Sequence, residues 1–383
     1  MEPTTAPIRV AHLLYTMAYG GVETVIINWF LAAPKESLEL SLIVFRVPGE
    51  LEMPFVKKAE EAGLKIQFIP WSRRKPIFRS ARELCKILKE NRIQILHTHN
   101  TYAEMVGLVA GKRLGLKLVS TQYVWISKEE AGLKRFLLLK LSAWFLPKYD
   151  LLTAQCEKTI RDSAQWGLDS SKIKLLPSGY DVPPPCNLSP EDRSRLRAEK
   201  GATAETIVVC NVARLYPEKG HERLLRLWPR ILERCPHARL WIYGVGPLED
   251  ELKQLWRELH LEETVRFEGF TGDLAKELEL CDVQIHPSFN EGIPIAICAG
   301  MASALPIVAT AVGGLPEVIY SGENGILVNV DDEDGLVEET VRLILDAKER
   351  NRLGQAAQRF IKEEYSLEAA ARILKETYQQ LVG

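Results

Sequence analysis

The amino-acid sequence predicts an α/β protein made of two units, each a parallel sheet covered by helices. With 383 residues the chain is too long for one ordinary core and suits two domains. Short β-rich segments alternate with segments of helical length, and this alternation occurs twice, on either side of a proline-rich stretch.

The first series begins with IRVAHLL at 8–14, whose apolar residues indicate a strand. Residues 22–33 follow a glycine pair and have the apolar spacing of a helix. Further strands are expected at 40–45, 65–70, 93–99, 116–121 and 149–154, with helices such as 79–90 between them. Strands separated by helices pair in parallel, so helices should cover both faces of this sheet.

The stretch SGYDVPPPCNLSP at 178–190 is the best candidate for a linker, because three successive prolines are incompatible with a helix and with a central strand. A second series of strands is expected at 206–213, 238–244, 264–270, 282–288, 305–310 and 325–330. The final segment, 366–383, has helical periodicity and opens with Ser366 as a capping candidate. Two such halves should leave a ligand cleft between them.

Composition excludes several classes of protein. Lys and Arg number 49 and Asp and Glu 51, so nucleic-acid binding driven by bulk charge is not expected. Seven cysteines without paired spacing indicate reduced thiols in a cytoplasm. The N-terminus lacks the pattern of a signal peptide, and no apolar stretch approaches the roughly 18–20 residues of a membrane span. We expect a cytoplasmic protein, at most peripheral at the inner face of a membrane.

Two loops that follow predicted strands carry charged residues at helix starts. In FNEGIPIAICAGMA, Glu291 follows a strand and could accept hydrogen bonds from hydroxyl groups without being buried; the alternative is an acid that caps the next helix. In NVARLYPEKG, Arg214 and Lys219 precede a helix start, where two cations and free amide groups suit a diphosphate. The alternative for this second loop is a solvated basic surface.

Two other motifs carry weaker signals. Gly244 and Gly246 in WIYGVGP lack the third glycine and the ribose-binding acid of a dinucleotide fingerprint. The acids of DDEDG at 331–335 precede a helix and favour its N-terminus more than a metal site. We expect neither a metal nor another cofactor.

Six segments of the second half, across about 207–330, occur in the order and spacing of one family: VARLYPEKG, WIYGVGPLEDEL, VRFEGF, HPSFNEGIPIAICAGMA, PIVATAVGGLPEVI and GENGILV. The second half resembles the donor-binding domain of retaining glycosyltransferases of family 4 (group 1), which have the GT-B fold. The first half matches more loosely through AYGGVET, ILHTHN and LLPSGYD. The resemblance implies two Rossmann-like domains whose parallel sheets face a central cleft: an acceptor-binding domain at 1–182, a donor-binding domain at 183–365, and a last helix at 366–383 that packs back on the first.

The resemblance also implies roles for individual residues. Arg214 and Lys219 would hold the donor diphosphate, and Glu291 would contact the hydroxyl groups of the transferred sugar. His99 would reach the donor sugar or the acceptor. These four residues form the expected catalytic set. The neighbouring His97 is expected to be a packing residue. The expected donor-binding residues are Gly20, Gly21, Gly244, Phe270, Gly292, Ile293, Pro294, Ile295 and Ala299. Phe270 would flank the nucleobase, and the pair at 20 and 21 would approach the phosphate or the sugar unless it only forms a turn.

One position departs from the family pattern. In the family, a second glutamate follows the first one eight residues later and binds the nucleotide ribose. This chain has Ala299 at that position. Losing that carboxylate would cost about 2–3 kcal/mol of donor binding. The chain is then a natural variant that holds the ribose otherwise, an enzyme with this residue replaced, or a binding relic without turnover.

The expected function is transfer of a sugar from a nucleotide-diphosphate sugar to a carbohydrate or lipid-linked acceptor, with retention of configuration, in polysaccharide or glycolipid synthesis. The alternatives are a non-catalytic binder of sugar nucleotides and a sugar-nucleotide epimerase on the same fold. Segments 71–79 and 132–149 combine apolar and basic residues and could contact anionic lipid. The alternative for 132–149 is a buried crossover helix with lysines that extend to solvent.

Overall fold

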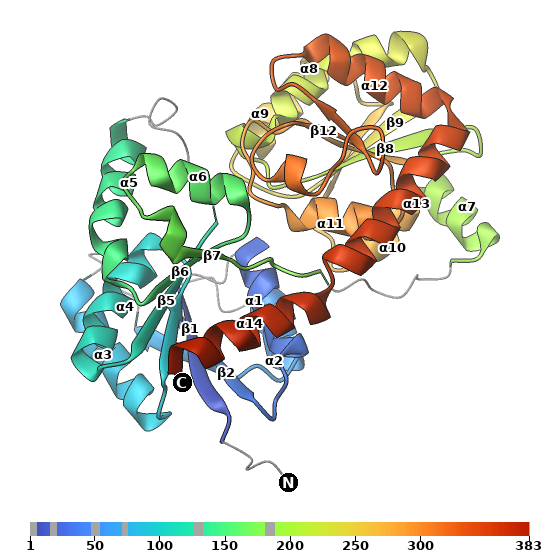
Figure 1. The fold of residues 1–383 in the computed structure, drawn as a ribbon. Coiled ribbons are helices and arrows are strands. Elements are labelled where there is room, and N and C mark those ends of the chain that lie inside the picture. Colours follow the sequence, from blue (N-terminus) through green and yellow to red (C-terminus); the bar gives the residue numbers. More distant parts are fainter. Residues whose placement is uncertain are drawn as a thin grey trace. The chain divides into compact units, whose positions relative to one another are not determined.

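The computed structural model describes residues 6–15, 21–46, 54–70, 76–123, 125, 133–180 and 188–382. Gly20, most of the predicted linker and residues 71–75 of the predicted basic segment lie outside this part of the chain. The chain divides into two compact units, Met1–Asp181 with Tyr365–Gly383, and Val182–Glu364. Figure 1 shows that each unit is a twisted sheet flanked by helices.

The first unit contains a seven-stranded parallel sheet in the order β3-β2-β1-β4-β5-β6-β7. Its strands are β1 (Ile8–Leu14), β2 (Leu38–Arg46), β3 (Ile66–Pro70), β4 (Ile95–Thr98), β5 (Lys117–Gln122), β6 (Leu151–Ala154) and β7 (Ile173–Leu175). Its helices are α1 (Gly21–Ala32), α2 (Pro54–Glu61), α3 (Ile77–Glu90), α4 (Thr101–Leu114), α5 (Leu133–Phe145), α6 (Glu157–Gln165) and α14 (Leu367–Val382).

Alternation along β2 shows why this sheet is buried on both faces. Ile43 and Phe45 belong to one apolar cluster, whereas Leu42 and Val44 belong to another. Because successive side chains of a strand point to opposite faces, the two clusters are the cores on the two sides of the sheet. Such strands read as continuous apolar runs in the sequence.

The second unit contains a six-stranded parallel sheet in the order β10-β9-β8-β11-β12-β13. Its strands are β8 (Ile207–Val212), β9 (Ala238–Tyr243), β10 (Val265–Gly269), β11 (Val283–His286), β12 (Ile307–Thr310) and β13 (Ile326–Val328). Its helices are α7 (Pro190–Glu199), α8 (His221–Arg234), α9 (Glu249–Glu258), α10 (Leu274–Glu279), α11 (Ile295–Ala302), α12 (Glu333–Leu345) and α13 (Ala347–Glu364).

All twelve predicted strands are present, with ends that differ by at most two residues from those expected. The strand β7 was not predicted, because three residues are too few to show alternation. The predicted cap of the last helix is confirmed: the Ser366 hydroxyl accepts a hydrogen bond from the Ala369 amide. Pro294 precedes α11 with extended backbone (ψ 131°).

Both sheets reverse their strand order at one internal position, between β1 and β4 in the first unit and between β8 and β11 in the second. Loops leave such a point in opposite directions, which opens a crevice at the carboxyl ends of the two strands. Chemically active side chains in these loops are therefore brought together by topology. Within the described ranges, none of the helices is both long and apolar enough to cross a membrane.

Candidate functional site

In the second unit, Lys219 and Glu291 meet at the point where the strand order reverses. Lys219 follows β8 and Glu291 follows β11, and the lysine Nζ lies 2.7 Å from the carboxylate Oε2. The other oxygen, Oε1, accepts hydrogen bonds from His286 Nε2 at 2.8 Å and from Ser288 Oγ at 2.9 Å. The carboxylate therefore has three protein partners.

Glu291 is buried, and its side chain is only 5% exposed. Burial by itself would raise its pKa, but the hydrogen bond and charge of His286 and the charge of Lys219 outweigh it and lower the pKa to about 2. We expected this acid to be accessible, and the structure instead shows a covered carboxylate that keeps its charge. It does not cap α11, whose N-cap is Pro294 without a side-chain hydrogen bond.

The loop that carries Glu291 is fixed at successive backbone positions. The Arg223 guanidinium donates to the Pro287 carbonyl, and Thr310 Oγ1 donates to the Ser288 carbonyl at 2.5 Å. The Phe289 amide donates to the Glu218 carbonyl at 2.8 Å, which joins this loop to the loop after β8. These bonds hold the carboxylate in place before any ligand binds.

Glycines allow the strand-end loops to approach one another at backbone distance. A Cβ atom at Gly220 would overlap the Pro287 carbonyl oxygen, and one at Gly313 would overlap that of Glu291. Gly244, with φ +136°, packs in the same way against Ala213. Any larger residue at these positions would separate the loops.

Arg214 supplies a second cation in the loop that also carries Lys219. Its guanidinium is exposed and lies over the ring of Tyr216, with 4.7 Å between Cζ and the ring centroid. Within the described ranges Arg214 forms no ion pair with a carboxylate, so its charge is available to an anion. An arginine is well suited to a phosphate because its planar fork can donate two hydrogen bonds.

The remaining predicted donor-binding residues surround this site in different ways. Phe270 follows β10 and is 45% exposed, so its ring can contact a ligand. The Gly292 carbonyl accepts a hydrogen bond from the Gly314 amide, and Ile293 is buried. Ile295 is the first residue of α11, and Ala299 lies one turn further along it with only 1% exposure.

A groove of about 590 Å³ lies next to this site, between α8 and α9. Tyr216 and Phe289 line it, but Lys219 and Glu291 do not. The ion pair therefore does not line this groove.

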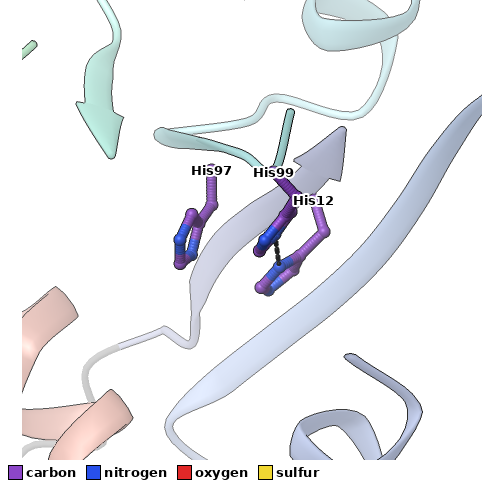
Figure 2. Close-up of side chains that lie close together, drawn as sticks. All are labelled: His12, His97 and His99. Atoms are coloured by element: carbon purple, nitrogen blue, oxygen red, sulfur yellow. Dashed lines mark hydrogen bonds between the residues drawn. The ribbon is translucent and has the colours of Figure 1, made fainter. Parts of the chain in front are cut away.

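In the first unit, three histidines gather where its strand order reverses. His12 lies on β1 opposite His97 of β4, and His99 follows β4. All three are buried, and one ring nitrogen of each lies within 4.8 Å of the others. Figure 2 shows the three rings side by side, with the hydrogen bond between His12 and His99 drawn.

Every ring nitrogen of this cluster has a protein partner. His12 Nδ1 and His99 Nε2 lie 2.9 Å apart, and Tyr378 of α14 contacts both His97 Nδ1 at 2.7 Å and His12 Nε2 at 3.3 Å. The outer nitrogens, His97 Nε2 and His99 Nδ1, contact Thr121 Oγ1 at 2.6 Å and the Tyr123 hydroxyl at 2.8 Å, respectively.

Burial lowers the pKa of His12 to about 3, and burial followed by the neighbouring rings lowers the pKa of His97 and His99 well below 6.5. Neutral imidazoles can ligate a metal such as zinc. Here, however, ligation would require breaking hydrogen bonds that already use all six nitrogens. The cluster fits a hydrogen-bonded network better than a metal centre.

The sequence predicts that His99 contacts a ligand. In the structure this residue is 3% exposed, and both of its ring nitrogens form hydrogen bonds within the protein. Its contact with a ligand stays a prediction, as does that of Gly21, the first residue of α1. The reasoning missed His286, whose position five residues before Glu291 at the end of β11 could have revealed it. No local signal marks Tyr378, which is distant in sequence from its partners.

Known protein families and individual relatives match most of the chain. The family model described as "Glycosyl transferases group 1" matches residues 192–360, and that described as "Glycosyltransferase Family 4" matches residues 19–182. The UDP-Gal:alpha-D-GlcNAc-diphosphoundecaprenol alpha-1,3-galactosyltransferase of Escherichia coli is 23% identical over 100% of this chain and 99% of that protein. The GDP-mannose-dependent monoacylated alpha-(1-6)-phosphatidylinositol monomannoside mannosyltransferase of Corynebacterium glutamicum is 29% identical over 57% of this chain and 59% of that protein.

Among solved structures, Anabaena Alr3699/HepE in complex with UDP and glucose has a TM-score of 0.86 and 21% identity, over 98% of this chain and 100% of that one. That likeness extends to both units and agrees with two parallel sheets, one per unit. With the two family models matching consecutive parts of the chain, the protein belongs to the group 1 glycosyltransferases of family 4 and is a glycosyltransferase with the GT-B fold.

Proposed function

We propose that the protein transfers a sugar from a nucleotide-diphosphate sugar to a hydroxyl group of a carbohydrate or lipid-linked acceptor, with retention of anomeric configuration. The observation that carries the proposal is the Lys219–Glu291 pair at the carboxyl ends of β8 and β11, with the exposed Arg214 in the same loop as Lys219. Two cations and an ionised carboxylate at a switch point suit a sugar diphosphate.

In the proposed reaction, the bond between the anomeric carbon and the diphosphate oxygen breaks, and a bond from the acceptor oxygen forms on the same face. Arg214 and Lys219 stabilise the negative charge that develops on the leaving diphosphate. The acceptor proton passes to an oxygen of that diphosphate. Glu291 accepts hydrogen bonds from the hydroxyl groups of the transferred sugar, for which its low pKa keeps it ionised.

Lys219 Nζ donates a hydrogen bond to Glu291 Oε2. When the sugar donor binds, the three N–H groups of the lysine are therefore shared between the carboxylate and a phosphate. We propose that these two cations replace the divalent metal that many sugar-nucleotide enzymes use, so that activity persists in EDTA. The donor would bind the second unit and the acceptor the first.

The names of the relatives support this substrate class and leave the donor open. One relative is named for UDP-galactose and a diphosphoundecaprenol acceptor, and another for GDP-mannose and a phosphatidylinositol mannoside. Both named acceptors are lipids that carry a sugar. We therefore propose a lipid-linked or polysaccharide acceptor in cell-surface glycan synthesis.

A face of α5 supports peripheral membrane contact. Leu137 is 58% exposed and Trp144 is 68% exposed, with Leu141 and Lys140 also exposed between them. Lys148 Nζ lies 3.3 Å from the centroid of the Trp144 ring. The alternative of a buried crossover helix does not fit these exposures. Apolar side chains with interspersed lysines favour anionic lipid.

The membrane proposal is tested by co-sedimentation with vesicles that contain anionic phospholipid. We expect the protein to bind, and Trp144→Glu to bind several-fold less. Leu345→Glu, which changes an exposed leucine of the second unit, is the matched control and should bind like the wild type. Equal binding of Trp144→Glu and the wild type, or no binding at all, would remove the proposal.

The reaction is tested with a panel of UDP-, GDP- and ADP-sugars, with lipid-linked sugar acceptors, in buffer containing EDTA. We expect one donor to yield free nucleotide and a glycoside whose anomeric configuration, read by NMR, equals that of the donor. An isomerised donor without a glycoside would establish an epimerase. Donor binding without turnover would establish a sugar-nucleotide binding protein, the alternative that Ala299 favours.

A further inference from the structure

Seven side chains of the first unit form one continuous series of hydrogen bonds, here called the histidine chain: Thr153, Thr121, His97, Tyr378, His12, His99 and Tyr123. Its outer links are the pair Thr153–Thr121 at 2.7 Å and the pair His99–Tyr123 at 2.8 Å. The members come from β6, β5, β4, α14 and β1 and from the ends of β4 and β5. Tyr378 is the one member contributed by the C-terminal helix.

A neutral imidazole has one N–H group and one lone pair. Each of the three histidines uses both ring nitrogens within the histidine chain. Each must therefore donate a hydrogen bond to one neighbour and accept a hydrogen bond from the other. Tyr378 is fully buried, and its partners in the described structure are two ring nitrogens. Its proton must therefore go to one of them, because an unpartnered buried hydroxyl is costly.

These conditions leave two arrangements of the hydrogen bonds along the histidine chain. If the N–H and O–H groups point toward Tyr123, all three histidines carry the proton on Nδ1. If they point toward Thr153, all three carry it on Nε2. A mixture would leave a buried donor facing a donor, or an acceptor facing an acceptor, at one of the links.

The two ends of the histidine chain select between the two arrangements. Thr153 is fully buried and its hydrogen-bond partner in the described structure is Thr121, whereas Tyr123 at the other end is partly exposed. Hydrogen bonds that point toward Thr153 would leave the proton of that buried hydroxyl without an acceptor, whereas hydrogen bonds that point toward Tyr123 leave the last O–H group at the partly exposed end, where water can accept it. The arrangement that points toward Tyr123, with all protons on Nδ1, is therefore the stable one.

We propose that Tyr378 is a positioning residue that couples the three histidines into this shared Nδ1–H state, so that His99 and Tyr123 meet the ligand of the first unit in one fixed hydrogen-bonding state. The part of the inference that concerns a ligand rests on the proposed function. The tautomers themselves are a property of the protein alone.

The test is the tautomer of each histidine, read from its ¹⁵N chemical shifts in the full-length protein without substrate. In the wild type we expect Nδ1–H at positions 12, 97 and 99. In Tyr378→Phe, His97 loses the acceptor of its Nδ1–H group and should move its proton to Nε2, where Thr121 can accept it. His12 and His99 should keep theirs on Nδ1, because a bare Nε2 needs no partner.

Two variants control this experiment. Thr377→Val removes the neighbouring hydroxyl of the same helix, which bonds only to the Ile373 carbonyl, and should change no tautomer. Thr121→Val should leave all three histidines as Nδ1–H, whereas in the opposite arrangement it would force His97 to change. Nε2–H in the wild type, mixed tautomers, or an unchanged His97 in Tyr378→Phe would overturn the proposal.

Sugar transfer provides the second readout. Tyr378→Phe should lower kcat by roughly three- to tenfold with little change in the donor KM, and Thr377→Val should behave like the wild type. Changed tautomers with unchanged kcat would overturn the positioning role and leave the proposed function intact. If the wild type transferred no sugar, the proposed function would fail, and the ¹⁵N shifts alone would decide whether Tyr378 couples the histidines.

Discussion

Lys219 and Glu291 form a buried ion pair, with 2.7 Å between Nζ and Oε2, although 72 residues separate them in the sequence. The pair exists because β8 and β11 are neighbours at the centre of their sheet and both end at the same edge. The lysine is thereby held where a diphosphate would bind, and the carboxylate is kept ionised by the charges around it.

Lys219→Ala should lower kcat/KM for sugar transfer by about 10²–10³-fold, the range typical of removing one group that stabilises developing negative charge. Glu291 would keep its bonds from His286 and Ser288, so the fold should persist. The matched control is Lys253→Ala, which removes a lysine paired with Glu249 on the surface of the same unit. Near-wild-type turnover of Lys219→Ala would refute the assignment of the leaving-group site.

Glu291→Gln tests the charge of the carboxylate through stability. A folded pKa of about 2, below the ordinary 4.5, stabilises the fold above pH 4.5, and this contribution is lost as the pH falls toward 2. The difference corresponds to about 3 kcal/mol for this buried group. We expect Glu291→Gln to be less stable than the wild type at pH 7 and to approach it near pH 3 in denaturation experiments.

The exposed carboxylate of Glu222 on α8 provides the control for that measurement. Glu222→Gln should follow the wild type at both pH values within the small energy of a surface ion pair. A constant difference between Glu291→Gln and the wild type from pH 7 to pH 3 would show that the carboxylate stabilises the fold by packing and not by its charge.

Much of the fold could be predicted because buried parallel strands leave a direct record in the sequence: a short apolar run between helical segments. The loops could be predicted as well, since Arg214, Lys219 and Glu291 lie in the short segments that follow such runs. Partners that depend on pairing between distant elements could not. The contact of Tyr378 with His97 spans 281 residues, and only the docking of α14 on the first unit creates it.

The burial of Glu291 was missed for a related physical reason. A glutamate in a glycine-containing loop is ordinarily solvated, and three donors, one from the end of β11 and one from each of two loops, are needed before its charge can be buried. Two of these donors, His286 and Ser288, are near it in sequence, but their direction depends on how Arg223 and Thr310 hold the backbone between them. Such tertiary constraints have no local pattern.

Ala299→Glu tests whether position 299 is a lost ribose contact. The side chain of a helical residue leans toward the helix N-terminus, so a glutamate there would extend over Ile295 and Ala296, which are both partly exposed. A carboxylate bonded to a diol contributes about 1.5–3 kcal/mol. We therefore expect donor binding to tighten by roughly ten- to a hundredfold, measured by calorimetry with the donor nucleotide.

Ala299→Gln is the matched control for this variant, because it has the same length without the charge and should tighten binding less. Equal affinities of the glutamate variant and the wild type would show that another group of this chain holds the ribose. In that case the alanine is native to the site and the chain is not a weakened enzyme.

The buried histidines predict a loss of stability in weak acid. The folded pKa of His12 is about 3, below its ordinary 6.5, so the unfolded chain binds a proton that the folded chain refuses, and stability falls as the pH drops from 6.5 toward 3. Each unit of pH costs about 1.4 kcal/mol for this group. The groups that face it, His97, His99 and Tyr378, offer no negative charge to offset the cost.

His12→Gln, which cannot titrate but keeps a donor and an acceptor, should reduce the slope of unfolding free energy between pH 6.5 and pH 4 by that amount. An equal slope in His12→Gln and the wild type would show that His12 is not held neutral by burial.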